Sequence, residues 1–128
     1  MSNNTNTIAV VDVQAVVENS AQVRALKEEQ TTKTKDLEAW LKNAQTEVKA
    51  EEDKAKQEAL LQKYNAEFAQ KRADLAQQYQ EKLRIISESI SQTVADYAQK
   101  NNYSLVLAKN ITLYGGVDIT EEIAKIVK

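Results

Sequence analysis

Short apolar segments near the two ends of the chain differ in pattern from everything between them. Residues 8–13, Ile-Ala-Val-Val-Asp-Val, are mostly β-branched, and this predicts a buried strand. About one helical turn is predicted over 14–19, and Ser20 is a suitable N-cap for a helix that follows. Apolar runs at 105–108 and 111–114 predict two further strands.

Nothing interrupts a helix between Ala21 and Lys100, because this stretch contains neither glycine nor proline. It holds thirteen alanines and only eighteen larger apolar residues, too few for a helix that is buried on all sides. The larger residues recur every eleven positions, as in the series Tyr64, Leu75, Ile86 and Tyr97. Eleven residues in three turns are about 3.67 residues per turn, so the apolar stripe runs nearly straight along the helix.

The end strands indicate that this helical tract turns back on itself. Strands need partners for their backbone groups, and the first strand meets the later ones only if Ser20 lies near Tyr97. We place the tip of the hairpin within 51–60, because this region contains the longest stretch without a large apolar residue. Residues whose numbers sum to 116, such as Leu41 and Leu75, would then face each other, although a shift of eleven matches the stripe equally well.

The C-terminal segment predicts a turn followed by a short helix. Gly115 and Gly116 are the only glycines, and without a flanking lysine or further glycines they indicate a turn and not a phosphate loop. Asp118 and Glu121 have the spacing of a capping box. We therefore expect a short helix at the end of the chain.

Together these elements predict a mostly α-helical fold with a small β body. We expect a flexible N-terminus over 1–7, a β-containing oligomerisation body over 8–20 and 101–128, and a long antiparallel helical hairpin over 21–100 that projects as an arm. A body of this size is near the lower limit for independent folding, and the chain has no cysteine for disulfides, so self-association is the remaining route. The strands would supply the interface, through Ile8, Val10, Val11, Val13, Leu105, Leu107, Leu113 and Tyr114.

The composition disfavours several classes of function. The absence of histidine and cysteine removes the usual metal ligands and the commonest catalytic bases and nucleophiles, so we expect neither an enzyme nor a cofactor. Seventeen basic and nineteen acidic residues are balanced along the helical tract without a basic face, which argues against nucleic acid and against a peripheral membrane helix. No apolar run is long enough for an integral membrane segment. The first seven residues lack the features of a secretion signal, which predicts the cytoplasm if the sequence is complete.

Both ends of the chain resemble the Skp/OmpH family of chaperones. The resemblance rests on residues 8–14, 103–107 and 113–122, with an alanine-, glutamine- and charge-rich helical tract between them. It implies a homo-oligomer, a trimer, whose helical arms enclose a cavity and hold unfolded outer-membrane proteins without nucleotide. It also implies the periplasm, if the sequence is a mature form. The expected tip is neutral and lacks the basic cluster of the well-known members, so a lipopolysaccharide site does not carry over.

Three arm residues are candidates for contact with unfolded clients. Trp40 lies just off the main stripe, where it either packs between the two helices of the arm or faces a client. Leu60 and Leu61 fall near the expected tip, where they either contact clients or indicate that the tip lies elsewhere. The alternative function is that of a structural coiled-coil spacer or adaptor without chaperone activity.

Overall fold

The computed structural model describes residues 7–128. The flexible N-terminus expected over 1–7 therefore lies outside the described residues, apart from Thr7. The mostly helical fold with a small sheet and a short C-terminal helix is confirmed. In chain order the elements are β1 (Ile8–Val11), α1 (Val13–Asn19), α2 (Ala21–Ala50), α3 (Lys54–Lys100), β2 (Leu105–Ala108), the 3-10 helix η1 (Lys109–Ile111), β3 (Val117–Asp118) and α4 (Thr120–Ile126).

The chain divides into two compact units, which we describe separately. The body unit contains the described residues up to Ala25 together with Leu83–Lys128, and the arm unit is Leu26–Lys82. The beginning of α2 and the second half of α3 thus belong to the body unit. The domain boundaries expected from the sequence, with a body over 8–20 and 101–128, stay a prediction.

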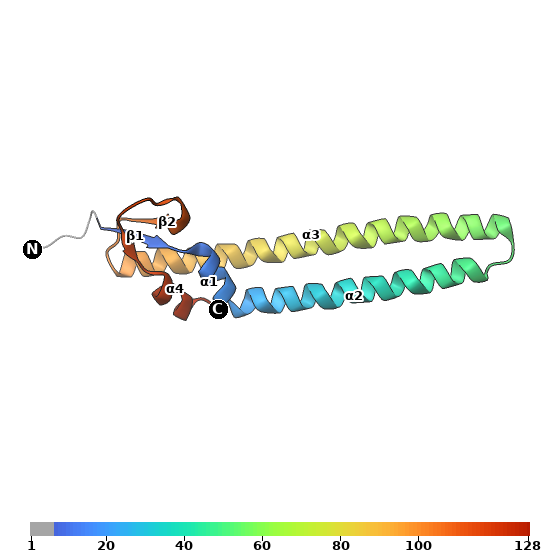
Figure 1. The fold of residues 1–128 in the computed structure, drawn as a ribbon, viewed down its shortest axis with the longest axis horizontal. Coiled ribbons are helices and arrows are strands. Elements are labelled where there is room, and N and C mark those ends of the chain that lie inside the picture. The colour runs from blue at the N-terminus through green and yellow to red at the C-terminus, as the bar shows by residue number, and fades with distance from the viewer. Residues whose placement is uncertain (1–6) are drawn as a thin grey trace, which may run out of the picture. The chain divides into compact units, whose positions relative to one another are not determined.

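The body unit contains a three-stranded parallel sheet, of which β1 and β2 are labelled in Figure 1. The strand order is β2-β1-β3, with Ile8 opposite Leu105 on one side of β1 and Ala9 opposite Val117 on the other. This pairing of the first strand with both later ones is the condition from which the hairpin was inferred. One face of the sheet packs into the core of the unit, whose buried members are Ala9, Val11, Val16, Ile90, Ile119 and Ile123.

The first strand is shorter than predicted. It ends at Val11, because the Asp12 side chain accepts a hydrogen bond from the Ala15 backbone N–H at 3.2 Å and so caps α1. Val13 is consequently the first residue of a helix and not the last of a strand. Ser20 caps α2 as predicted: its Oγ accepts from the Val23 N–H at 3.3 Å.

The predicted strand at 111–114 is wrong. Ile111 ends the 3-10 helix η1, and the backbone N–H of Thr112 bonds to the carbonyl of Lys109, which turns the chain away from the sheet. The third strand is instead the two-residue β3, and Gly116 lets it approach β1. A Cβ on Gly116 would lie 2.7 Å from Cγ1 of Val10, and its φ of 87° is one that residues with side chains rarely adopt.

The short C-terminal helix is confirmed, but the capping box is not. The N-cap of α4 is Ile119, which makes no side-chain capping bond. Asp118 lies one residue earlier, and its Oδ1 accepts from both the N–H and the hydroxyl of Thr120. The helix therefore begins one residue later than the box requires.

In the arm unit α2 and α3 lie side by side and antiparallel, joined by residues 51–53 (Figure 1). Side chains build this turn without glycine or proline. Asp53 Oδ1 accepts from the Lys56 N–H at 3.1 Å and caps α3, and Gln57 Nε2 donates to the last turn of α2 at the Val48 carbonyl, 2.9 Å away. The turn lies inside the 51–60 region in which the sequence analysis placed the tip.

Contacts between the two helices do not follow the expected register. Those that join polar side chains are Glu29 with Lys82, Lys33 with Gln78, and Glu47 with Tyr64. The numbers of each pair add up to five less than the expected sum of 116. The capped three-residue turn lies at the start of the expected region, and this displaces the pairing.

Candidate functional site

An aromatic cluster occupies the middle of the arm unit. The ring of Trp40 from α2 stacks on Phe68 from α3 with a centroid distance of 6.4 Å and an interplanar angle of 9°. Tyr64, one turn earlier on α3, meets the same indole edge-on at 5.7 Å. Trp40 is therefore the α2 side of an interhelical contact, yet it stays only half-buried. The two roles expected for Trp40 from the sequence, packing between the helices and contact with a client, both fit this position.

Cations of α3 lie over all three rings. The Nζ of Lys71 is 5.3 Å from the centroid of Trp40, and the guanidinium of Arg72 is 5.8 Å from that of Phe68. Lys63 Nζ lies 5.9 Å from the Tyr64 ring. At exposed sites such cation–π contacts are weak, on the order of 0.5–1 kcal/mol each. The cations thus lie over part of the surface of three half-buried aromatic rings.

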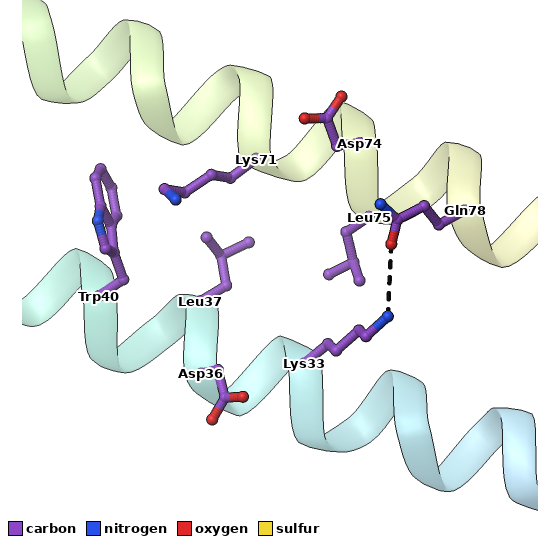
Figure 2. Close-up of a pocket in the computed structure, with 8 residues that line it drawn as sticks. All are labelled: Lys33, Asp36, Leu37, Trp40, Lys71, Asp74, Leu75 and Gln78. Carbon is purple, nitrogen blue, oxygen red and sulfur yellow. Dashed lines mark hydrogen bonds between the residues drawn. The ribbon is translucent and has the colours of Figure 1, made fainter.

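Figure 2 shows the groove that begins at Trp40, which we call the Trp40 groove. Leu37 and Leu75 point toward each other at its floor, and Lys33 closes one end through a 3.5 Å hydrogen bond to Gln78. The groove has a volume of about 440 Å³ and is lined by Lys33, Asp36, Leu37, Trp40, Lys71, Asp74, Leu75 and Gln78. Of its charged lining residues, Lys33 and Lys71 reach into the gap between the helices, whereas the carboxylates of Asp36 and Asp74 point away from it (Figure 2).

Two more grooves lie along the same helix pair. One, of about 460 Å³, shares Leu37 and Leu75 with the Trp40 groove and adds Leu41 and Phe68. The other, of about 340 Å³, lies nearer the turn and is lined by residues that include Leu41, Val48, Leu61 and Tyr64. Leucines of the apolar stripe thus form the walls of these grooves.

Leu60 and Leu61 differ in exposure. Leu61 is 46% exposed and lines the groove nearer the turn, whereas Leu60 is half-buried. Both lie within two turns of the start of α3, so the structure brings them near the end of the arm. It does not bring them to the Trp40 groove, which neither of them lines.

An ion cluster ties α2 to α3 beyond the groove. Glu29 Oε1 is 2.6 Å from Lys82 Nζ across the helix pair and 2.9 Å from Lys33 Nζ on its own helix. Hydrogen bonds from Lys82 and then from Lys33 lower the pKa of Glu29 to about 2. The same contact raises the pKa of Lys82. All three side chains are more than one third exposed, so solvent screens this attraction.

The residues predicted to form the oligomerisation body fall into two groups. Val10 and Val11 are buried in the chain's own core, and Leu107 is half-buried. The others are exposed: Ile8 at 37%, Val13 at 50%, Leu105 at 49%, Leu113 at 103% and Tyr114 at 97%.

The most exposed part is the segment 111–114, which we call the apolar segment. Ile111 is 75% exposed, so three of the four side chains of the apolar segment, those of Ile111, Leu113 and Tyr114, lie largely in solvent. An ion pair anchors the loop that carries it: Lys109 Nζ lies 2.8 Å from Asp118 Oδ2. Hydrogen bonds from Lys109 and Thr120 lower the pKa of Asp118 to about 2. The sequence analysis selected Leu113 and Tyr114 here but not Ile111, although the same apolar run contained it.

The body unit also has an apolar groove that the sequence analysis did not find. It lies between the end of α3 and β2, has a volume of about 430 Å³, and includes Val94, Ala98, Tyr103, Leu105 and Val106 in its lining. We call it the body groove. β2 is an edge strand of the sheet, so one row of its backbone groups has no strand partner in the described chain. This edge exists only once β2 has paired with β1, so the sequence pattern alone does not reveal it.

These sites offer apolar and aromatic contact surface. Among residues 7–128 no group of three or more acidic side chains could hold a metal ion. Within the same range no helix is long and apolar enough to cross a membrane.

Comparison with known proteins finds one family. The family described as outer membrane protein (OmpH-like) matches residues 7–127. A comparison with curated proteins gives no match.

Proposed function

Because the chain belongs to the OmpH-like family, we propose that it is an ATP-independent holdase chaperone. Family membership indicates a periplasmic, chaperone-like role. On this proposal the clients are unfolded outer-membrane-type proteins, and the compartment is the periplasm. The clients lie in a cavity between the helical arms of a homo-oligomer, where they are kept apart and cannot aggregate.

One observation in particular supports this proposal: the apolar stripe of the arm is incompletely buried. Within 26–82 only Leu26 and Ala44 are buried among the apolar residues, and the larger side chains of the stripe stay half-buried or exposed. Each square ångström of apolar surface removed from water contributes roughly 25 cal/mol. An unfolded chain that lies along this stripe therefore gains many small apolar contacts without adopting one conformation. Trp40, Leu60 and Leu61 are the contact residues we propose.

The homo-oligomer is supported by the body unit. A surface segment as apolar and exposed as Ile111, Leu113 and Tyr114 is typical of an interface. We propose that the apolar segment of one copy docks in the body groove of the next, beside the edge strand β2. A head-to-tail contact closes into a ring when the rotation between successive copies divides a full turn, and forms an open filament otherwise. The proposed ring has three subunits, the number that the family resemblance implies.

Light scattering coupled to size exclusion tests the assembly. The wild-type particle should have about three times the 14.4 kDa chain mass. The double substitution Leu113→Ser with Tyr114→Ser should reduce the particle toward the monomer, because it removes two apolar side chains from the proposed contact. Ile85→Ser is the matched control, since Ile85 is 53% exposed but lies on α3 outside both surfaces. Unchanged mass in the double variant would exclude the apolar segment as the interface.

Aggregation of a diluted, urea-unfolded β-barrel protein tests the holdase. Turbidity should fall to near background at one oligomer per client, with no nucleotide present. The assembly-deficient double variant should protect much less, because a single arm encloses no cavity. A wild-type oligomer that leaves turbidity unchanged would contradict the chaperone and would favour a structural spacer.

A further inference from the structure

We propose that the Trp40 groove is a subsite that binds an aromatic side chain from an extended, uncharged segment of the client. This inference rests on the proposed holdase function and names the class of segment that one part of the arm selects. Three features of the groove carry it: its floor, the cover over its indole, and the charge of its rim.

The floor of the groove fits one large apolar side chain. Trp40, Leu37 and Leu75 give it three apolar surfaces (Figure 2). Its volume of about 440 Å³ falls within the range of about 300–1,000 Å³ that is usual for ligand sites. Phe68 already stacks on Trp40 and fixes the orientation of the indole, so an incoming ring meets a rigid aromatic surface.

The indole is covered only by a side chain that can move aside. Lys71 Nζ lies 5.3 Å from the ring centroid, and Lys71 is an exposed residue of α3. A lysine has a long flexible stem and keeps its ammonium in water when the stem shifts. An aromatic ring that replaces this cation loses a weak contact and gains both an aromatic pair and buried apolar area.

The charge of the rim determines which segments fit. The carboxylates of Asp36 and Asp74 point away from the gap between the helices, and the ammonium of Lys71 lies over Trp40, so the groove offers no carboxylate partner to a cationic occupant (Figure 2). Glu29 further holds Lys33 through the 2.9 Å ion pair. A charged segment loses hydration on entry and gains no excess of opposite charge. The complementary occupant is therefore an aromatic side chain whose neighbours in the client are uncharged.

Trp40 is the chain's only tryptophan, so its fluorescence reports on this groove alone. The probe is a short blocked peptide of alternating Phe with Ser or Thr, without tryptophan or tyrosine. Titration into the oligomer should shift Trp40 emission and saturate. Replacing each Phe of the peptide with Leu should weaken binding by about 3–10-fold, the loss expected for one aromatic pair. Replacing half of the Ser and Thr with Lys should also weaken binding.

Rim substitutions test the charge argument while they leave the reporter in place. Lys71→Glu makes the rim net negative and should improve binding of the Lys-bearing peptide at least about threefold relative to the uncharged one. Lys63→Glu changes the charge of the arm equally, but Lys63 lies over Tyr64 and does not line the groove, so it should leave peptide preference unchanged. Equal changes in both variants would overturn the rim argument.

The outcomes separate this subsite from the holdase itself. If the wild-type protein prevents client aggregation but its Trp40 emission never responds to the peptide, the subsite is disproved and the holdase stands. If the peptide gives a saturable response while aggregation is not prevented, the groove binds aromatic segments and the chaperone is disproved. A response that is the same for the Phe and Leu peptides would remove the aromatic selectivity.

Discussion

The two adjacent glycines of the body provide a matched pair of substitutions. Gly115 and Gly116 both have positive φ, 90° and 87°, so an alanine at either position incurs backbone strain of about 1–2 kcal/mol. An alanine at either position also reduces the entropy of the unfolded chain, which offsets about 0.4–1 kcal/mol of that strain. These two effects are nearly equal at both positions. They therefore cancel when Gly115→Ala is compared with Gly116→Ala.

What differs is the space around the new methyl group. A Cβ at Gly115 meets nothing within 4 Å, whereas a Cβ at Gly116 lies 2.7 Å from Val10 Cγ1. Carbon atoms normally rest about 3.5–4.0 Å apart, so the second methyl overlaps by about 1 Å. Val10 cannot rotate away easily, because it is β-branched, only 5% exposed, and part of the central strand β1. Overpacking of this kind costs about 1–3 kcal/mol.

We therefore expect Gly115→Ala to lower the free energy of unfolding by about 1 kcal/mol and Gly116→Ala by about 2–4 kcal/mol. Urea titration followed by circular dichroism, at one fixed protein concentration, measures both values. The concentration must be fixed because assembly contributes to stability. Equal losses in the two variants would refute the close approach of β3 to β1.

Two further substitutions test the arm. Asp53→Ala removes the capping acceptor for the Lys56 N–H and should lower the free energy of unfolding by about 1 kcal/mol in a urea titration. Glu52→Ala in the same turn should lower it by less. Equal losses in the two variants would exclude the cap. Glu29 has a pKa of about 2 when folded and 4.5 ordinarily, so its stabilisation is present above about pH 4.5 and is lost as the pH falls toward 2. Glu29→Gln should remove that part of the acid dependence in a pH titration of stability, and a pH dependence identical to that of the wild-type chain would exclude the ion cluster.

The hairpin could be predicted from sequence because two independent signals agree. Eighty residues without glycine or proline predict continuous helix, and strand pairing at the two ends forces that helix to reverse. The register could not be predicted, because apolar positions that repeat every eleven residues match themselves after a shift. The bonds that Asp53 and Gln57 make in the turn decide it, and such local side-chain bonds leave little trace in an apolar pattern.

The body was predicted less well, for a physical reason. Pattern analysis assumes that apolar residues are buried by their own chain, and on that assumption Ile111, Leu113 and Tyr114 resembled a strand. In the structure they are the most exposed large apolar side chains of the described residues. The actual third strand has two residues and contains Asp118, so it has no apolar pattern to detect. The apolar run that was misassigned as a strand is thus a solvent-exposed segment, and it is the segment for which we propose an interface.

Under the proposed function, packing within the arm and binding to the client use the same side chains. Leu37 and Leu75 point into the gap between α2 and α3, where they form the floor of the Trp40 groove, while Leu41 lines both of the other grooves (Figure 2). A stripe buried completely between the helices would stabilise the arm but leave no apolar surface for a client. A wider stripe would bind clients but would also bind other arms. Half-burial is a compromise between these limits, and it explains why alanine and balanced charge fill the rest of both helices. It also implies that a client which spreads along the grooves draws the helices apart or together as its own apolar residues require, so that one arm can hold many different sequences.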